Sequence, residues 1–251
     1  MSLSVCIITV TYGNRKEFVE NSIENAIKCA NVKRIILVDN NSNFDEGYIK
    51  NIKKPTLIKV VQNKKNLGSA GGFKKGIEEY LLNPQEDFVL FLDDDNALRE
   101  NTIQQLLISY KKMSNNSGSV GLLCVREEMK KYYLISRGKL PPNILKNYYS
   151  FARFSIFDIF SKLRYRLLSK KENNTLYKTE PIEIDNGYWS GLFIAKDTVL
   201  NANLPNDSFF VYKDDHEYIY NLRKKGLKLF LTPDAQLTEM DKSWATVSSK
   251  T

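Results

Sequence analysis

Three consecutive aspartates, Asp93, Asp94 and Asp95, directly follow the apolar segment 88–92. Side chains alternate along an extended chain, so we expect Asp93 and Asp95 to project to one side and Asp94 to the other. Two carboxylates at the end of a strand offer the oxygen ligands that a hard divalent cation prefers. An acidic turn that merely ends the strand is the alternative, because turns favour aspartate.

Two further acidic positions could do chemistry. Asp39 follows the apolar segment 35–38, and its carboxylate could accept hydrogen bonds from a base or a sugar. A turn or cap role is the alternative for Asp39. Asp214 and Asp215 open a predicted helix at residues 214–225, where acids usually cap the helix and complement its dipole. The functional alternative is a general base that deprotonates an alcohol. The sequence's only histidine, His216, follows them, and we expect it on the helix surface.

Residues 66–76 are rich in glycine and follow a predicted strand. We expect a loop as far as Gly72 and then a helix at residues 73–82. Glycines let the backbone approach a ligand closely, and a helix N-terminus favours anions. The segment matches neither the dinucleotide fingerprint nor the phosphate loop, so a flexible connector is the alternative.

The spacing of hydrophobic residues along the chain predicts the strands and helices that position these candidate site residues. Strands are expected at residues 4–10, 34–38, 57–61, 88–92 and 119–125, with helices at 16–30, 73–82 and 101–113. This alternation predicts an α/β fold with an open, mostly parallel sheet and helices on both faces. Ligands of such sheets bind beyond the carboxyl ends of the strands. The polar clusters all follow strands, so we expect them to gather along one edge, which favours a ligand site over a simple acidic turn.

The pattern changes after residue 125. Residues 126–178 are basic and aromatic, and residues 151–171 have the spacing of an amphipathic basic helix. Packing on the protein's own core is favoured over membrane contact for this helix. Residues 184–195 look strand-like, and residues 227–231 predict a final strand that Pro233 ends.

Bulk composition narrows the classes of function. The length of 251 residues suits one large domain or a core domain with a subdomain. The net charge of +8 suits an anionic partner. The longest apolar runs are strand-sized, and no secretory signal is visible at the start. The three cysteines lie far apart, which favours buried thiols in a reducing compartment over a zinc site.

Four ordered motifs together resemble the family 2 glycosyltransferases of the GT-A fold. They are Thr-Tyr-Gly-Asn-Arg at residues 11–15, Val-Asp-Asn-Asn-Ser at 38–42, Asn-Leu-Gly-Ser-Ala-Gly-Gly-Phe at 66–73, and Leu-Asp-Asp-Asp at 92–95. The third motif is similar to the galactofuranosyltransferase and rhamnosyltransferase branch. Tyr-Trp-Ser-Gly at 188–191 and Asp-Asp-His-Glu at 214–217 continue the likeness, which runs from residue 5 to about residue 233.

The resemblance implies inverting transfer of a sugar from a nucleotide-diphosphate donor, a UDP- or dTDP-sugar. Asp93 and Asp95 would hold Mg²⁺ or Mn²⁺ on the diphosphate. Arg15 and Asp39 would contact the nucleotide. The remaining residues that the resemblance assigns to the sugar donor are Thr11, Tyr12, Asn66, Gly68, Gly72 and Asp94.

For the acceptor, the resemblance implies that Asp215 is the catalytic base that deprotonates the attacking hydroxyl. Trp189 would stack on a sugar ring, with a core tryptophan as the alternative, and Ser190 and Asp214 would lie beside the acceptor. Related enzymes often carry a metal-binding histidine where this chain has Glu239. A carboxylate also binds Mg²⁺ or Mn²⁺, so we expect Glu239 to be the third metal ligand, with Asp241 as the fallback.

The resemblance suggests a bacterial-type enzyme of surface polysaccharide synthesis with a glycan or lipid-linked acceptor. We expect it in the cytoplasm, with peripheral contact at the anionic inner face of the cell membrane, and without nucleic acid as a partner. Residues 1–125 would bind the nucleotide sugar, 126–180 would form the basic insert, and 181–251 would complete the same domain and bind the acceptor. A nucleotidyltransferase and a nucleic-acid-binding module remain alternatives, although the loop after the first strand is a poor triphosphate loop and no RNA-binding motif is present.

Overall fold

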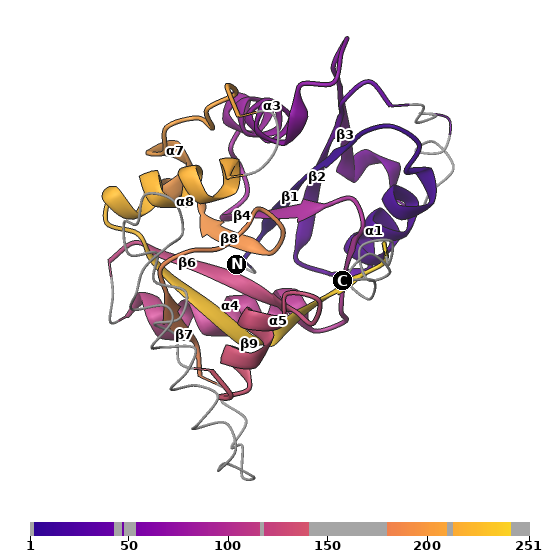
Figure 1. Cartoon of the computed structure of the whole chain (residues 1–251). Helices are drawn as coiled ribbons and strands as arrows, with labels where there is room; N and C mark the ends of the chain where they lie inside the picture. Colours follow the sequence, from indigo (N-terminus) through magenta and orange to yellow (C-terminus); the bar gives the residue numbers. More distant parts are fainter. Residues whose placement is uncertain are drawn as a thin grey trace, which may run out of the picture.

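The computed structural model describes residues 3–42, 47, 54–115, 118–140, 180–209 and 213–241. These residues form a nine-stranded sheet in the order β3-β2-β1-β4-β8-β6-β9-β5, with β7 paired to β9. Helices cover both faces of the sheet (Figure 1). The predicted basic helix at residues 151–171 lies outside the described residues.

The strands are β1 (Val5–Thr11), β2 (Val32–Asp39), β3 (Ile58–Gln62), β4 (Phe88–Asp93), β5 (Asn96–Leu98), β6 (Val120–Arg126), β7 (Ile182–Ile184), β8 (Leu192–Ala195) and β9 (Lys228–Glu239). The helices are α1 (Lys16–Lys28), α3 (Gly68–Leu82), α4 (Thr102–Ser114), α5 (Lys130–Ser136), α7 (Lys196–Leu200) and α8 (Asp214–Lys224), with a short 3-10 helix, η1 (Pro55–Leu57). Within the described part of the chain, every helix is too short or too polar to cross a lipid bilayer.

The sheet is mixed but mostly parallel in its first half. Strands β3, β2, β1 and β4 run parallel to one another. Strand β8 is antiparallel to both β4 and β6, while β6 and β9 are parallel to each other. This arrangement confirms the predicted α/β class and gathers the carboxyl ends of β1, β2 and β4 at one edge of the sheet.

Alternation along the strands divides the core between the two faces of the sheet. Val5 and Ile7 of β1 pack in the cluster that α1 and α4 cover. Cys6 and Ile8 pack in the cluster that α3 and α8 cover. Because both faces are buried, β1 reads as a continuous apolar run rather than an alternating one.

Helix α3 begins at Gly68, so the prediction of a loop through Gly72 was wrong. A Cβ at Gly72 would lie 2.4 Å from Val10 Cγ1, and one at Gly76 would lie 2.3 Å from Ile8 Cγ2. The helix therefore lies so close to β1 that only glycine fits at its contact positions. The helix forms despite the low helix propensity of glycine because its other residues bury an apolar face on the sheet.

Strand β9 continues to Glu239, so the prediction that Pro233 ends the last strand was also wrong. The register with β6 shifts where Cys124 pairs with Thr232 and Val125 pairs with Gln236. Proline is tolerated at such an irregularity because the ladder is interrupted there. Beyond it, β9 pairs with the unpredicted strand β5, and Glu239 lies opposite Asn96.

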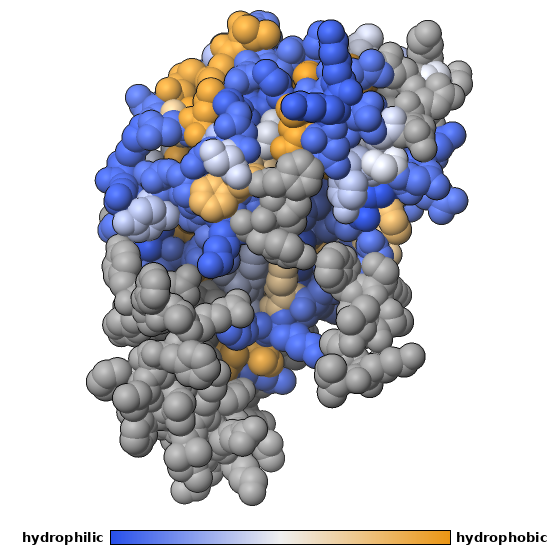
Figure 2. Space-filling model, turned by 45° about the horizontal axis from the view of Figure 1, so that its top comes forward, coloured by the Kyte–Doolittle hydropathy of each residue, from blue (hydrophilic) through white to orange (hydrophobic). Residues whose placement is uncertain are grey.

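Only the two ends of the predicted strand-like segment 184–195 are extended: Ile184 is the last residue of β7, and Leu192–Ala195 form β8. Residues 185–191 form no strand, and Gly191, directly before β8, adopts a positive φ of 92°. The face of the molecule in Figure 2 is largely hydrophilic over the described residues, with apolar residues gathered toward its upper left.

Candidate active site

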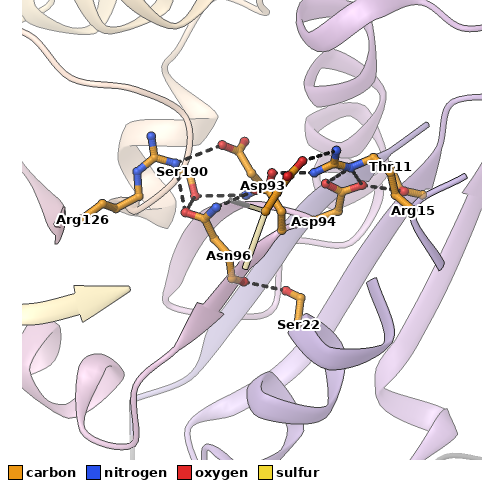
Figure 3. Close-up of polar contacts among 10 residues, drawn as sticks. Thr11, Arg15, Ser22, Asp93, Asp94, Asn96, Arg126 and Ser190 are labelled. Atoms are coloured by element: carbon orange, nitrogen blue, oxygen red, sulfur yellow. Dashed lines mark hydrogen bonds and ion pairs between the residues drawn. The ribbon is translucent and has the colours of Figure 1, made fainter. Parts of the chain in front are cut away.

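The acidic triplet lies where β4 ends, and its three side chains point in directions that alternation does not predict. Strand β4 stops at Asp93, and the chain turns through Asp94 and Asp95 into β5. Asp94 and Asp95 both pair with Arg15, whereas Asp93 faces Arg126 (Figure 3). Because the extended chain ends at Asp93, strand alternation does not determine the directions of the Asp94 and Asp95 side chains.

Arg15, in the loop after β1, lies among three carboxylates. Its Nε donates to Asp94 Oδ1 at 2.9 Å, its Nη2 pairs with Asp95, and its Nη1 lies 3.2 Å from Asp241 Oδ2. Thr11 Oγ1 also donates to Asp94 Oδ2 at 2.7 Å. Burial lowers the pKa of Arg15, but the charges of Asp94 and Asp95 raise it by a larger amount, so the net shift of the pKa is upward. In this structure Arg15 and Thr11 therefore hold the acidic turn, rather than facing open space for a nucleotide.

Burial sets much of the electrostatics of the acidic turn. It raises the pKa of Asp94 to about 6, although Arg15 and the Thr11 hydrogen bond act in the opposite direction. Burial also raises the pKa of Asp93, with Arg126 opposing the shift and Asp95 and Asp94 adding to it. The Asp93 side chain remains 41% exposed, so water moderates its shift and a ligand can reach it.

Arg126 is a site residue that the sequence pattern did not single out. It ends β6, is 5% exposed, and places Nη1 3.4 Å from Asp93 Oδ2. Its guanidinium carbon lies 5.2 Å from the ring centroid of Tyr188. Among the described residues, its Nε finds no hydrogen-bond partner. The sequence feature that could have identified Arg126 is its position as a basic residue directly after the apolar segment 120–125.

Asn96 and Ser190 connect Arg126 to the acidic turn. Asn96 Oδ1 accepts hydrogen bonds from Arg126 Nη1 at 3.0 Å and from Ser190 Oγ at 2.9 Å. Asn96 Nδ2 donates to Asp95 Oδ1 at 2.6 Å. The Asp93 amide donates to Ser190 Oγ at 3.1 Å. Ser190 is 0% exposed, so the structure does not support its predicted contact with an acceptor.

The carboxylates near the turn have the oxygen chemistry that Mg²⁺ or Mn²⁺ requires. Glu239 lies on β9 opposite Asn96, and the next amide, of Met240, donates to the Asp95 carbonyl at 2.8 Å. Burial raises the pKa of Glu239, with Asp95 and Asp241 among the groups that add to the shift. Among the described residues, no three His, Cys, Asp or Glu side chains already surround a common point. The donor set therefore has the chemistry of a Mg²⁺ or Mn²⁺ site, and in this structure the guanidinium of Arg15 is the cation that pairs with Asp95 and Asp241.

The predicted base lies at the N-terminus of α8. Burial raises the pKa of Asp215, and His216 opposes that shift, with its Nδ1 3.9 Å from Asp215 Oδ1. Asp215 also contributes to the raised pKa of Asp93, so the two carboxylates lie within electrostatic reach. Lys213, just before the helix, has a positive φ of 68°, which turns the chain into α8.

Trp189 and Asp214 form a buried pair rather than an open acceptor surface. The indole Nε1 donates to Asp214 Oδ2 at 2.8 Å, and both residues are at most 5% exposed. The indole stacks on Phe73 at a centroid distance of 4.5 Å and contacts the rings of Phe91 and Tyr218. The expectation that Trp189 stacks on a sugar is therefore not supported, because aromatic side chains of the core cover it.

The residues predicted to contact the sugar donor lie at the ends of β1 and β2 and at the start of α3. Asp39 is 4% exposed and accepts the Ser42 amide at 2.7 Å. Asn66 Oδ1 accepts the amide of Gly68, whose φ of 73° favours glycine. Gly72 packs on Val10 and leaves no room for a ligand on that side. Tyr12 is 51% exposed, and the guanidinium carbon of Arg15 lies 5.5 Å from its ring centroid.

Comparisons with known proteins support the α/β fold described above and identify a family. The family model described as "Glycosyl transferase family 2" matches residues 6–184. No curated protein sequence matched the chain. Among solved structures, Staphylococcus aureus TarS has a TM-score of 0.58 at 11% identity, with 96% of this chain and 37% of that chain covered.

Two further structures were solved with ligands. GalNAc-T7 with UDP, GalNAc and Mn²⁺ has a TM-score of 0.62 at 15% identity, covering 94% of this chain and 44% of that chain. Mannosyltransferase PcManGT from Pyrobaculum calidifontis, in complex with GDP-Man and Mn²⁺, has a TM-score of 0.62 at 13% identity, covering 96% of this chain and 57% of that chain. The chain thus spans less than two thirds of the length of these structures. At such identities the likeness shows the fold alone, which is the GT-A fold.

Proposed function

Because this chain belongs to glycosyl transferase family 2, we propose that it transfers a sugar from a nucleotide-diphosphate donor to a hydroxyl of a glycan or lipid-linked acceptor, with inversion. The observation that carries the proposal is the acidic turn at the end of β4. It lies on the same sheet edge as Asp39 and within electrostatic reach of Asp215. This edge is where ligands of such sheets bind.

The nucleotide would lie over the ends of β1 and β2. Tyr12 would stack on the base, and Asp39 would accept hydrogen bonds from the base or ribose once it exchanges its contact with the Ser42 amide. The first turn of α3, which begins at Gly68, is a helix N-terminus, where backbone amides and the helix dipole favour an anion. Asn66 holds that turn through the Gly68 amide.

Asp93, Asp95 and Glu239 would hold Mg²⁺ or Mn²⁺, with Asp241 as an additional or alternative ligand. When bound, the cation supplies charge that stabilises the departing nucleoside diphosphate. Arg15 would keep Asp94 and the turn in place while Asp95 engages the metal. Arg126 adds a fixed positive charge beside Asp93, which lowers the cost of gathering these carboxylates.

Asp215 would accept the proton of the acceptor hydroxyl as that oxygen attacks the anomeric carbon. Burial raises the pKa of Asp215 toward neutral pH, and a pKa nearer the working pH makes the carboxylate a better general base. Attack from the face opposite the leaving diphosphate inverts the anomeric configuration. Asp214 and Trp189, buried below Asp215, would fix the first turn of α8 rather than touch the acceptor.

The Asn-Leu-Gly-Ser-Ala-Gly-Gly-Phe motif at residues 66–73 supports a galactofuranosyl- or rhamnosyltransferase-like specificity. The net charge of +8 supports peripheral contact with an anionic membrane that carries a lipid-linked acceptor, at the cytoplasmic face. Synthesis of a cell-surface polysaccharide would be the setting. We further propose that residues 1–125 bind the nucleotide sugar and that residues 181–251 bind the acceptor, with residues 126–180 as an insert.

A melting-temperature panel of UDP-, dTDP- and GDP-sugars, each with and without Mn²⁺, tests the proposal. A ligand that binds only the folded state stabilises it by about 2.7 kcal/mol at a concentration 100-fold above its dissociation constant. We expect a shift with UDP- or dTDP-sugars that Mn²⁺ enlarges and EDTA abolishes. No shift with any nucleotide sugar would refute the assignment of the sugar-donor site.

A further inference from the structure

The buried side chain of Asn96 is the centre of a polar network in the described part of the site (Figure 3). Asn96 is 0% exposed. Its amide contacts three different elements: the acidic turn through Asp95, the end of β6 through Arg126, and the segment before β8 through Ser190. Figure 3 shows Arg126 and Ser190 directed at the Asn96 amide.

Only an amide satisfies this set of partners. Asp95 presents a carboxylate and needs a hydrogen-bond donor, whereas Arg126 and Ser190 both present donors and need an acceptor. The asparagine side chain offers the two functions from one rigid plane, with NH₂ facing Asp95 and oxygen facing the other two. An aspartate at position 96 would have the same shape but would place an oxygen against the Asp95 carboxylate.

The network also reaches Asp93. Ser190 Oγ, which donates to Asn96, accepts the amide of Asp93 at 3.1 Å, and Arg126 Nη1 contacts both Asn96 and the Asp93 carboxylate. One side chain therefore fixes the Asp95 carboxylate directly and Asp93 through two intermediaries. Side chains that orient metal-binding carboxylates in this way typically affect metal affinity or activity 10- to 100-fold.

We propose that Asn96 is the positioning residue of the acidic turn, which sets the Asp93 and Asp95 carboxylates for a divalent cation on a nucleoside diphosphate. The inference rests on the proposed function, because it deepens the role of that same site. Asn96 touches neither substrate nor metal in this role. It acts by holding Asp95 and by keeping Arg126 and Ser190 against Asp93.

The test is Asn96→Asp, with Mn²⁺ and UDP as the probes. The substitution keeps the shape and both acceptor contacts, but it replaces the donor to Asp95 with a carboxylate oxygen and adds a buried negative charge. We expect a lower melting temperature without ligand, because the new carboxylate is buried against Asp95. We also expect an apparent Mn²⁺ affinity in the presence of UDP weaker by about 10- to 100-fold, and a smaller UDP-dependent shift. If Asn96→Asp does not fold, Ser190→Ala, which removes one partner of the network, is expected to weaken Mn²⁺ binding in the same direction.

Ser22→Ala is the matched control. Ser22 Oγ donates to the backbone carbonyl of Asn96 at 2.9 Å from α1 and touches none of the carboxylates. It should leave Mn²⁺ affinity unchanged. Wild-type Mn²⁺ affinity in both Asn96→Asp and Ser190→Ala, with a normal wild-type response to nucleotides, would overturn the positioning role alone. No response of the wild type to any nucleotide sugar would instead refute the proposed function, and the positioning role with it.

Discussion

At the scale of single residues, Asp215 has an environment suited to a base. Burial raises its pKa above the ordinary carboxyl value of about 3.9, and His216 lowers it in part. Transfer would need the carboxylate form, so activity should be lost as the pH falls through the raised pKa. The acid limb of the pH profile of kcat/KM is therefore expected above pH 4. Removing His216 should raise the pKa of Asp215 further.

We accordingly predict that His216→Gln moves the midpoint of the acid limb to higher pH. The backbone amide of residue 216 would still donate to Asp215 Oδ1, so the geometry of the base is retained. Lys224→Gln, at the other end of α8, removes a positive charge and should leave the midpoint unchanged. Asp215→Asn should keep nucleotide binding and reduce transfer by about 10²- to 10⁴-fold. An unchanged midpoint in His216→Gln, or retained transfer in Asp215→Asn, would contradict this role of Asp215.

The sequence identified the residue types of the site better than their contacts. Asp93 to Asp95, Asp39 and Asp215 follow strands or open a helix, and periodicity suffices to find such positions. The role of Trp189 was harder to predict, because the sequence is equally compatible with a tryptophan that stacks on a sugar and with one buried in the core. The stacking of Phe73, from 116 positions earlier in the chain, decides it. Arg126 and Asn96 become site residues only through partners brought close by the fold.

At the scale of elements, glycine-rich motifs illustrate what a local pattern cannot settle. Residues 66–72 predicted a loop, because glycine disfavours helices. In the fold, α3 already begins at Gly68, and Gly72 and Gly76 allow contact with β1 that any side chain would prevent. The close packing explains Gly72 and Gly76 without a ligand. Gly68 differs, since its positive φ of 73° sets the start of the helix beside the predicted nucleotide site.

We predict that Gly72→Ala destabilises the fold by about 1–3 kcal/mol, because the new Cβ would lie 2.4 Å from Val10 Cγ1 and 3.0 Å from Asn40 Nδ2. Urea unfolding followed by circular dichroism measures the loss. Gly118→Ala is the control, since a Cβ there has nothing within 4 Å. Equal unfolding free energies for the two variants would show that α3 can move away from β1 without cost.

At the scale of the whole molecule, strands from distant parts of the sequence alternate across the sheet. Strand β8 lies between β4 and β6, pairing Phe88 with Ala195 and Leu122 with Phe193. The order of the first three parallel strands follows from their apolar runs and short crossovers. The insertion of β8 and the extension of β9 do not, because both depend on pairing between strands that lie far apart in the sequence, such as Leu122 with Phe193 and Asn96 with Glu239.

This interleaving predicts that residues 1–125 and 181–251 unfold together. Trp189 reports on both, because it stacks on Phe73 and contacts Tyr218 of α8. In a Trp244→Phe variant, which leaves Trp189 as the only tryptophan, we expect its fluorescence and the far-ultraviolet circular dichroism to change at the same urea concentration. A fluorescence transition at lower urea, with the secondary structure retained, would show that α8 and the predicted acceptor side separate first. In that case the two parts would be distinct folding units, and the placement of Asp215 opposite Asp93 would depend on their docking rather than on one continuous core.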